Sequence, residues 1–175
     1  MIGHVGRFFA QKNHRFLLEI FAQIHKRNAD AVLLLVGDGE LRGEIEKQIR
    51  DSGLDECVIL AGVQSDVNPY YHAMDVMLLP SLYEGKPFVI IEAQASGLPC
   101  VISDKVPSEC ILVKGLVTQV ALTESAKIWA DNICSCVDNP RFGYAQKIKD
   151  SGYDISQNTY WLQNFYLSKG KSFNE

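Results

Sequence analysis

The sequence predicts an α/β domain built on a doubly wound parallel sheet of about six strands, with helices on both faces. Two observations favour this fold class. Short apolar segments of strand length alternate with longer segments whose apolar residues recur at helical spacing, along the whole chain. Most of the strand segments are also apolar at nearly every position, which is typical of parallel strands covered on both faces. The crossovers between such strands are expected to be right-handed.

Six segments are predicted as strands. The clearest are 31–36 (AVLLLV) and 75–80 (DVMLLP), because each is a run of apolar residues closed by a glycine or a proline. Segment 116–122 is the weakest of the six. The predicted strands are 2–6, 31–36, 57–62, 75–80, 99–103 and 116–122.

Six further segments are predicted as helices. In segment 13–26 the apolar residues recur at intervals of three and four, which places them on one helix face. Gly53 and Gly97 follow two of the segments, as glycine commonly does at the carboxyl end of a helix. The predicted helices are 13–26, 41–52, 66–74, 87–96, 124–137 and 155–167.

Length and composition indicate one globular domain, residues 1–175. Hydrophobic residues make up 47% of the chain and charged residues 22%, and the formal net charge is −4. An acidic balance argues against a nucleic-acid partner held by bulk charge. No apolar run approaches the roughly 18 residues of a membrane span, so we expect a cytoplasmic protein. The five cysteines, odd in number and widely spaced, are interpreted as small apolar residues in a reducing compartment.

The four histidines form no cluster with ligand spacing, so neither a metal nor another cofactor is expected. The chain opens directly on a predicted strand, although natural domains usually begin in exposed, loosely held residues. We therefore expect it to be a piece of a longer protein.

Ligands of doubly wound sheets bind beyond the carboxyl ends of the strands, which directs attention to the loop at 81–86. Glu84 lies in that loop, and Glu92 follows with seven residues between them. Gly85 allows unusual backbone shapes and Pro87 suits a first helical turn, so a helix should start near Lys86 and favour an anion such as phosphate there. Two carboxylates flanking an anion site match a nucleotide-sugar: sugar, diphosphate and ribose. A solvated loop glutamate and a helix-surface glutamate are an equally good interpretation of the spacing alone.

Two other loops contribute candidates. Arg7 and Lys12 follow the first predicted strand and could hold a diphosphate, although ordinary surface cations would be the better interpretation of either residue in isolation. The run VGDGE around Gly37 has a glycine pair but lacks the third glycine of a dinucleotide fingerprint, so a tight turn is its default explanation.

Taken together, these motifs resemble a known family. The segments HVGRFFAQKNHRFLLEIF, LLLVGDGELRGEIE, VILAGVQSDVNPYYHAMDVMLLPSLYEGKPFVIIEAQASGLPCVISD and WADNI are similar to the family 4 glycosyltransferases of the GT-B fold, and most similar to the bacterial capsular and exopolysaccharide enzymes. The resemblance runs from about residue 2 to residue 133. It implies that the chain is the carboxyl-terminal, donor-binding half of such an enzyme, a Rossmann-like domain.

The resemblance also implies roles for individual residues. Arg7 and Lys12 match the cations that hold the donor diphosphate and stabilise the leaving group, and Glu84 matches the glutamate that contacts the donor sugar. Glu92 matches the glutamate that holds the ribose. Further matches to the donor site are Gly6, Gly37, Val63, Gln64, Gly85, Lys86, Pro87, Phe88 and Val89. The implied reaction transfers a hexosyl group with retention, without a metal, and stabilises the leaving diphosphate electrostatically.

Two departures from the family stand out. Position 86 is usually apolar, and here Lys86 either adds a cation near the phosphates or is a neutral surface change. The amino-terminal acceptor domain has no counterpart, so the aromatic residues of segment 155–167 either show an apolar face or cover this domain's own core. Those residues are Tyr160, Trp161, Phe165 and Tyr166.

The expected partners are therefore a nucleotide-sugar donor, UDP-linked by preference, the acceptor domain, and a glycan or lipid-linked acceptor, but no nucleic acid. Peripheral association with the inner face of a membrane stays open for the full-length protein. Two other functions also stay open: a sugar-nucleotide epimerase of the GT-B type, and a non-catalytic module that binds nucleotide-sugars.

Overall fold

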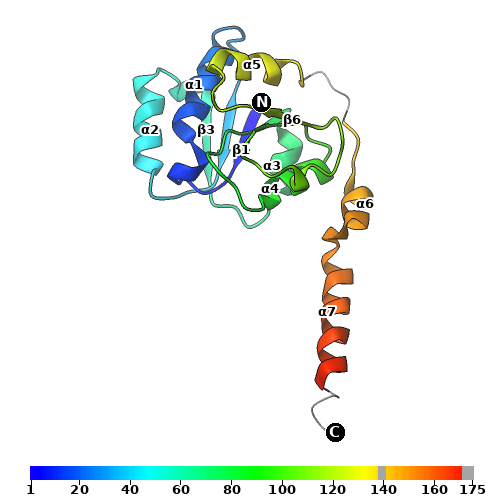
Figure 1. Cartoon of the computed structure of the whole chain (residues 1–175). Coiled ribbons are helices and arrows are strands. Elements are labelled where there is room, and N and C mark those ends of the chain that lie inside the picture. Colours follow the sequence, from blue (N-terminus) through cyan, green and yellow to red (C-terminus); the bar gives the residue numbers. More distant parts are fainter. Residues whose placement is uncertain (138–140, 171–175) are drawn as a thin grey trace.

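The computed structural model describes residues 1–137 and 141–170 and confirms the predicted fold class. One sheet of six parallel strands runs in the order β3-β2-β1-β4-β5-β6 (Figure 1). The strand order reverses between β1 and β4, because the chain first builds outward on one side of β1 and then returns to build on the other. This reversal is the point at which doubly wound sheets open a crevice for ligands.

All six predicted strands form, each one or two residues shorter at one end or at both ends. Their bounds are β1 Ile2–Val5, β2 Leu33–Val36, β3 Val58–Gly62, β4 Val76–Leu79, β5 Cys100–Ser103 and β6 Val117–Val120.

The six predicted helices form as well, and a further short one, α6, was not predicted. The helices are α1 His14–His25, α2 Arg42–Asp51, α3 Asn68–Ala73, α4 Phe88–Ala95, α5 Ala126–Cys134, α6 Ala145–Ile148 and α7 Ile155–Gly170. Helix α4 begins two residues later than the predicted start at Lys86, because the Pro87 backbone is extended, with ψ of 94°.

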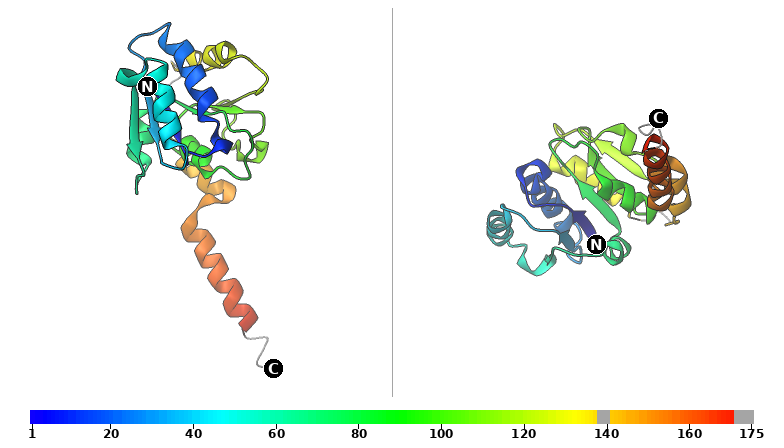
Figure 2. Two further views of the ribbon diagram at one scale, coloured as in Figure 1. Left: turned by 90° about the vertical axis from the view of Figure 1, so that its left-hand side faces the viewer. Right: turned by 90° about the horizontal axis from the view of Figure 1, so that it is seen from below.

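Two apolar layers sandwich the sheet. Alternate strand residues face opposite sides, so Leu33 and Leu35 of β2 pack into one cluster, while Leu34 and Val36 pack into the other. The first cluster takes its helical residues from α1, α2 and α5, and the second takes them from α3 and α4. Figure 2 shows helices on both sides of the sheet in the view from below.

The prediction that the third strand is fully buried is wrong. Ile59 in β3 is 47% exposed, and no residue of this strand falls in the buried class. The reason is position: β3 forms one edge of the sheet and has only β2 as a neighbour. An apolar run therefore indicated a strand correctly but did not distinguish a central strand from an edge.

The carboxyl-terminal segment departs from the compact layers. After α6 a π-helical turn, Lys149–Tyr153, contains Gly152 at φ +90°, and α7 then extends away from the sheet (Figures 1 and 2). Tyr160, Trp161 and Tyr166 are 65–70% exposed, and Phe165 is 42% exposed. Of the two alternatives for these aromatic residues, the structure supports the apolar face that is open to solvent.

Two further features concern membrane spans and cysteines. No helix in the described part of the chain is long and apolar enough to cross a membrane. All five cysteines are free thiols; three are buried, Cys136 is half-buried and Cys134 is exposed. Cys57, Cys100 and Cys110 pack in the core as small apolar residues.

Candidate functional site: the crevice beyond the strand ends

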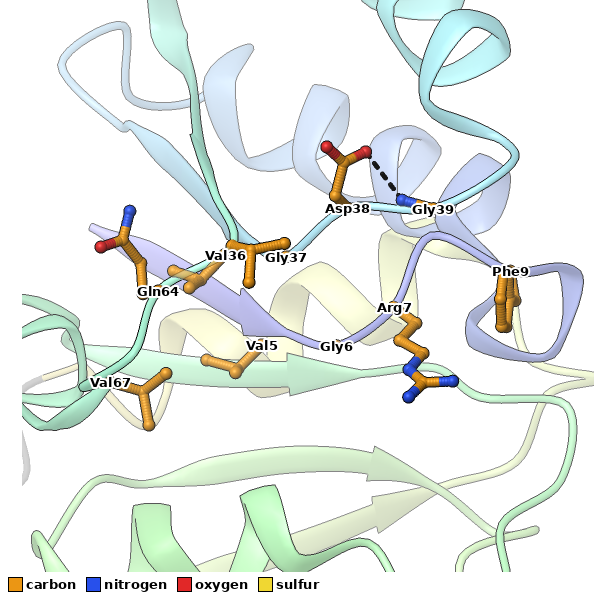
Figure 3. Close-up of a pocket in the computed structure, with 11 residues that line it drawn as sticks. Val5, Gly6, Arg7, Phe9, Val36, Gly37, Asp38, Gly39, Gln64 and Val67 are labelled. Atoms are coloured by element: carbon orange, nitrogen blue, oxygen red, sulfur yellow. Dashed lines mark hydrogen bonds between the residues drawn. The ribbon is translucent and has the colours of Figure 1, made fainter.

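A pocket of about 590 Å³ opens beyond the carboxyl ends of β1, β2 and β3. This volume is within the usual range for small-molecule sites. Figure 3 shows Arg7 and Phe9 at one end of the pocket and Gln64 and Val67 at the other. Its lining contains five of the predicted site residues: Gly6, Arg7, Gly37, Val63 and Gln64.

The loops that line this pocket meet through backbone contacts at Gly37. Gly37 has φ of +135°, and a Cβ atom built on it would lie 2.0 Å from the carbonyl oxygen of Gly6. The Gly37 N–H in turn donates to the carbonyl of Gly62 at 2.8 Å. Only glycine fits such a position, since a side chain would be both strained and in collision. The glycine pair of GDG therefore does more than form a tight turn: it lets the loops after three strands meet.

The charged groups of the pocket differ in how they are held. Arg7 is exposed, with its guanidinium carbon 6.0 Å from the centre of the Phe9 ring. The carboxylate of Asp38 accepts hydrogen bonds from the Gly39 N–H at 2.7 Å and from Arg42 at 3.0 Å. These bonds, the backbone bond first, hold the pKa of Asp38 below its usual range. Arg42 thus compensates the charge of Asp38, and Arg7 forms no ion pair with a carboxylate within the described residues.

Lys12 and Glu84 form an ion pair beside this pocket. The ammonium of Lys12 lies 2.6 Å from Oε1 of Glu84, and the two side chains are only 15% and 6% exposed. Gln11 donates to Oε2 of Glu84 at 3.2 Å and to the carbonyl of Tyr83 at 2.9 Å. The pair thus joins the loop after β1 to the loop after β4. Asn13 adds a bond at the same junction, from its amide to the carbonyl of Pro80 at 3.1 Å.

Two buried histidines lie under the same loop. His4 bonds the carbonyl of Leu78 through Nδ1 at 2.9 Å, and its ring stands edge-on to His14 with 4.8 Å between centroids. A Cβ atom on Gly6 would lie 3.0 Å from Nε2 of His4 and 3.3 Å from Cε of Lys12, so these three residues converge. Burial lowers the pKa of His4 to about 4 and that of His14 to about 2. Both rings are therefore neutral near pH 7 and add no positive charge beneath Lys12.

Glu92 lies apart from the ion pair, on α4. It is exposed, and its Oε2 accepts a hydrogen bond of 2.7 Å from the hydroxyl of Tyr71, a fully buried residue of α3. Together with Phe88, Glu92 lines a separate hollow of about 350 Å³, whose other wall is made by residues of α6, the π-helical turn and α7. The predicted site residues thus fall in three neighbouring places rather than in one cavity.

The segment from Gly85 to Val89 forms the turn before α4 and its first residues. Gly85, Lys86 and Phe88 are exposed, Pro87 is buried and Val89 is half-buried. The ammonium of Lys86 lies 4.7 Å from the centre of the Tyr153 ring, and a hydrogen bond to Tyr153 raises its pKa. In this structure Lys86 therefore contacts the carboxyl-terminal segment.

Sequence reasoning missed several contributors, namely Phe9, Gln11, Asn13, Asp38 and Tyr71. Gln11 and Asn13 flank Lys12 and belong to the same loop, so their position was a usable signal. Tyr71 carried no such signal, because it meets Glu92 from another helix. Within residues 1–137 and 141–170 no three His, Cys, Asp or Glu side chains come close enough to hold a metal ion.

The sheet topology, with a pocket beyond the carboxyl ends of β1, β2 and β3, defines a doubly wound α/β domain. The chain belongs to the group 1 glycosyltransferases, since the sequence model of that family matches residues 1–139.

Two curated relatives illustrate this membership. The chain is 40% identical to EpsF of Bacillus subtilis strain 168, a protein named as a glycosyltransferase, over 99% of this chain and 46% of EpsF. It is 38% identical to the UDP-Gal:alpha-D-GlcNAc-diphosphoundecaprenol alpha-1,3-galactosyltransferase of Escherichia coli, over 62% of this chain and 29% of that enzyme. The chain thus spans less than half the length of both relatives.

Solved structures share the fold. The crystal structure of HepE from Anabaena in complex with UDP superposes with a TM-score of 0.71 at 22% identity, over 95% of this chain and 48% of HepE.

Proposed function

We propose that this chain is the donor-binding half of a retaining glycosyltransferase that transfers a hexosyl group from a nucleotide-sugar during polysaccharide biosynthesis. The observation that carries the proposal is the Lys12–Glu84 ion pair beside the Arg7 pocket. A nucleotide-sugar places a diphosphate between two polyhydroxy groups, and the pair offers a cation and a carboxylate side by side at the ligand end of the sheet.

The cations act on the diphosphate. Arg7 is free of any ion pair within the described residues and offers a planar fork to phosphate oxygens. Lys12 uses one of its three N–H donors on Glu84, which leaves two for a phosphate. As the sugar–phosphate bond breaks, negative charge grows on the leaving diphosphate, and fixed cations stabilise that charge more than the ground state. No metal is needed in this scheme.

The carboxylates act on hydroxyl groups. Glu84 is held by Lys12 and Gln11, yet a carboxylate has about four acceptor positions, so it can still accept a bond from the donor sugar. Glu92 would hold the ribose, and the backbone around Gly37, Val63 and Gln64 would line the base. The turn at 85–89 would close over the sugar and the phosphates.

The relatives support the reaction class. The Escherichia coli relative is named for a UDP-linked galactose donor and a diphosphoundecaprenol-linked acceptor, and HepE was crystallised with UDP. By analogy we propose a UDP-hexose donor and a glycan or lipid-linked acceptor for the full-length enzyme. That enzyme would work in the cytoplasm, at the inner face of the membrane when the acceptor is a lipid. The acceptor domain would supply the second wall of the active site.

Calorimetric titration without metal tests the proposal. UDP, UDP-glucose, UDP-N-acetylglucosamine and GDP-mannose are each added to the wild-type chain and to the variants Arg7→Ala and Glu92→Ala. We expect one nucleotide series to bind, and both variants to lose binding while keeping their fold. Arg15→Ala is the matched control, because Arg15 is an exposed α1 cation paired with Glu19 at 3.4 Å. Binding that is absent in the wild type, or unchanged in Arg7→Ala, would overturn the assignment.

A further inference from the structure

The carboxylate of Glu92 is fixed by a residue from another helix. Within the described residues its only side-chain bond is the one that Oε2 accepts from the Tyr71 hydroxyl, at 2.7 Å. The Tyr71 ring is completely buried, so its hydroxyl cannot move away, whereas Glu92 is exposed and would otherwise sample several rotamers. Oε1 of Glu92 keeps all of its acceptor positions for a ligand.

The two helices that carry this pair are also joined at their carboxyl ends. The guanidinium of Arg141 donates to the carbonyls of Met74 at 2.7 Å, Tyr71 at 3.0 Å and His72 at 3.4 Å, all in or just after the last turn of α3. It also donates to the carbonyl of Ser96, the residue that ends α4, at 3.2 Å. Such carbonyls lack partners within their own helix, and a cation there interacts favourably with the helix dipole.

Tyr71 takes part in both connections, through its hydroxyl to Glu92 and through its carbonyl to Arg141. The spacing between α3 and α4 is therefore set at two separate points, and the bond between Tyr71 and Glu92 spans a gap of fixed width. A phenylalanine at this position would fill the core in the same way but could not donate a hydrogen bond to Glu92.

We infer that Tyr71 is a positioning residue that holds the Glu92 carboxylate ready for the ribose hydroxyls of the donor, with Arg141 fixing the helix spacing. This inference rests on the proposed function. Tyr71 does not touch the ligand itself. Its hydroxyl removes rotamer freedom from Glu92 before binding, so less conformational entropy is lost when the ribose is captured.

A comparison of two ligands separates positioning from a general structural role. UDP has both ribose hydroxyls, and 2′,3′-dideoxyuridine 5′-diphosphate has neither. Calorimetric dissociation constants for both ligands are measured on the wild-type chain and on Tyr71→Phe, which removes one oxygen atom. We expect Tyr71→Phe to raise the dissociation constant for UDP about tenfold, because the substitution frees one long side chain before binding. The dissociation constant for the dideoxy ligand should rise less than twofold.

Tyr70→Phe is the matched control, because Tyr70 is the next residue on α3 and its hydroxyl has no hydrogen-bond partner within the described residues; it should change neither constant. Circular dichroism checks that each variant is folded. Glu92→Asp, a change on the exposed face of α4 that withdraws the carboxylate by one methylene, should repeat the selective loss without disturbing the core.

The outcomes are distinct. Wild-type chain that binds neither ligand overturns the proposed function, and this inference with it. Wild-type chain that binds UDP, combined with a Tyr71→Phe variant that weakens both ligands equally or weakens neither, overturns the positioning role alone.

Discussion

The ammonium of Lys12 and the carboxylate of Glu84 lie 2.6 Å apart, although 72 residues separate them in the sequence. One belongs to the loop after β1 and the other to the loop after β4, so the pair bridges the point at which the strand order reverses. Gln11 supports the same carboxylate from the side. This ion pair therefore fixes the position of the loop after β1 relative to the loop after β4.

Breaking the bridge on one side should destabilise the fold. Lys12→Met leaves Glu84, only 6% exposed, without its cation, and removal of one partner from a buried pair typically costs about 3 kcal/mol. Urea denaturation should show this loss, and the double variant Lys12→Met/Glu84→Gln should recover most of it. The control Lys105→Met breaks an exposed pair with Asp104 and should change stability by less than about 1 kcal/mol. Equal losses for Lys12→Met and Lys105→Met would contradict the role of burial.

Gly37→Ala should damage both stability and the pocket. The new Cβ would meet the Gly6 carbonyl at 2.0 Å, at a φ of +135° that alanine rarely adopts, so we expect a loss of about 1–3 kcal/mol. Nucleotide titration should also fail, because the loops after β1 and β2 must separate. Gly43→Ala is the contrasting change. Gly43 lies in α2, where an added Cβ atom would meet no atom of another segment within 4 Å, so the substitution should stabilise the fold by about 0.5–1 kcal/mol. Equal changes in the free energy of unfolding for Gly37→Ala and Gly43→Ala would contradict the close contact between Gly37 and the Gly6 carbonyl.

Acid should weaken the fold through His4 and His14. Both pKa values are lowered by burial, to about 4 and about 2, from an ordinary value of 6.5. Below pH 6.5 the unfolded chain binds protons that the folded chain does not. The free energy of unfolding therefore has its full value above pH 6.5 and falls as the pH drops toward 4. Each histidine should remove about 2 kcal/mol by pH 5.

Urea midpoints at pH 7.5 and pH 5.0 measure this effect. The free energy of unfolding should differ between the two pH values, and His14→Phe should reduce that difference by about half. His72→Gln, at an exposed position, should leave the difference unchanged. A wild-type chain that is equally stable at both pH values would show that the rings are not buried as described.

Arg141→Ala should loosen the carboxyl-terminal segment from the sheet. Its guanidinium bonds four carbonyls across α3 and α4, and loss of charged hydrogen bonds of this kind costs about 2 kcal/mol. Hydrogen exchange in residues 141–153 should accelerate in this variant. The same substitution at Arg50, an exposed residue in the last turn of α2, serves as the control and should leave that exchange unchanged.

The sequence was informative wherever the signal was local. In the part of the chain that the structure describes, apolar runs and helical spacing predicted all six strands and six of the seven α-helices, because each pattern is set by the element's own burial. The loops after the strands could be placed at one end of the sheet for the same reason, since parallel strands all end at the same edge. Arg7, Gly37, Val63 and Gln64 are in one pocket as a direct result.

Contacts between distant segments were beyond that kind of reasoning. Nothing in the sequence around Glu92 pointed to Tyr71, and nothing around Lys12 fixed its partner as Glu84. The exposure of strand β3 was not predicted, because an edge strand and a central strand can have the same apolar composition. The short helix α6 was missed because four residues carry too little periodicity to be seen.

The projecting helix α7 carries one of the two intrinsic fluorescent reporters of the protein, and α5 carries the other. The chain has two tryptophans. Trp129 is fully buried and donates its indole N–H to the carbonyl of Ala121 at 3.1 Å, whereas Trp161 is 65% exposed on α7 and stacks on Phe165. Acrylamide should quench Trp161 readily and Trp129 hardly at all. A blue shift confined to Trp161 would then report the docking of α7 against another surface, while a red shift of Trp129 would report loss of the core.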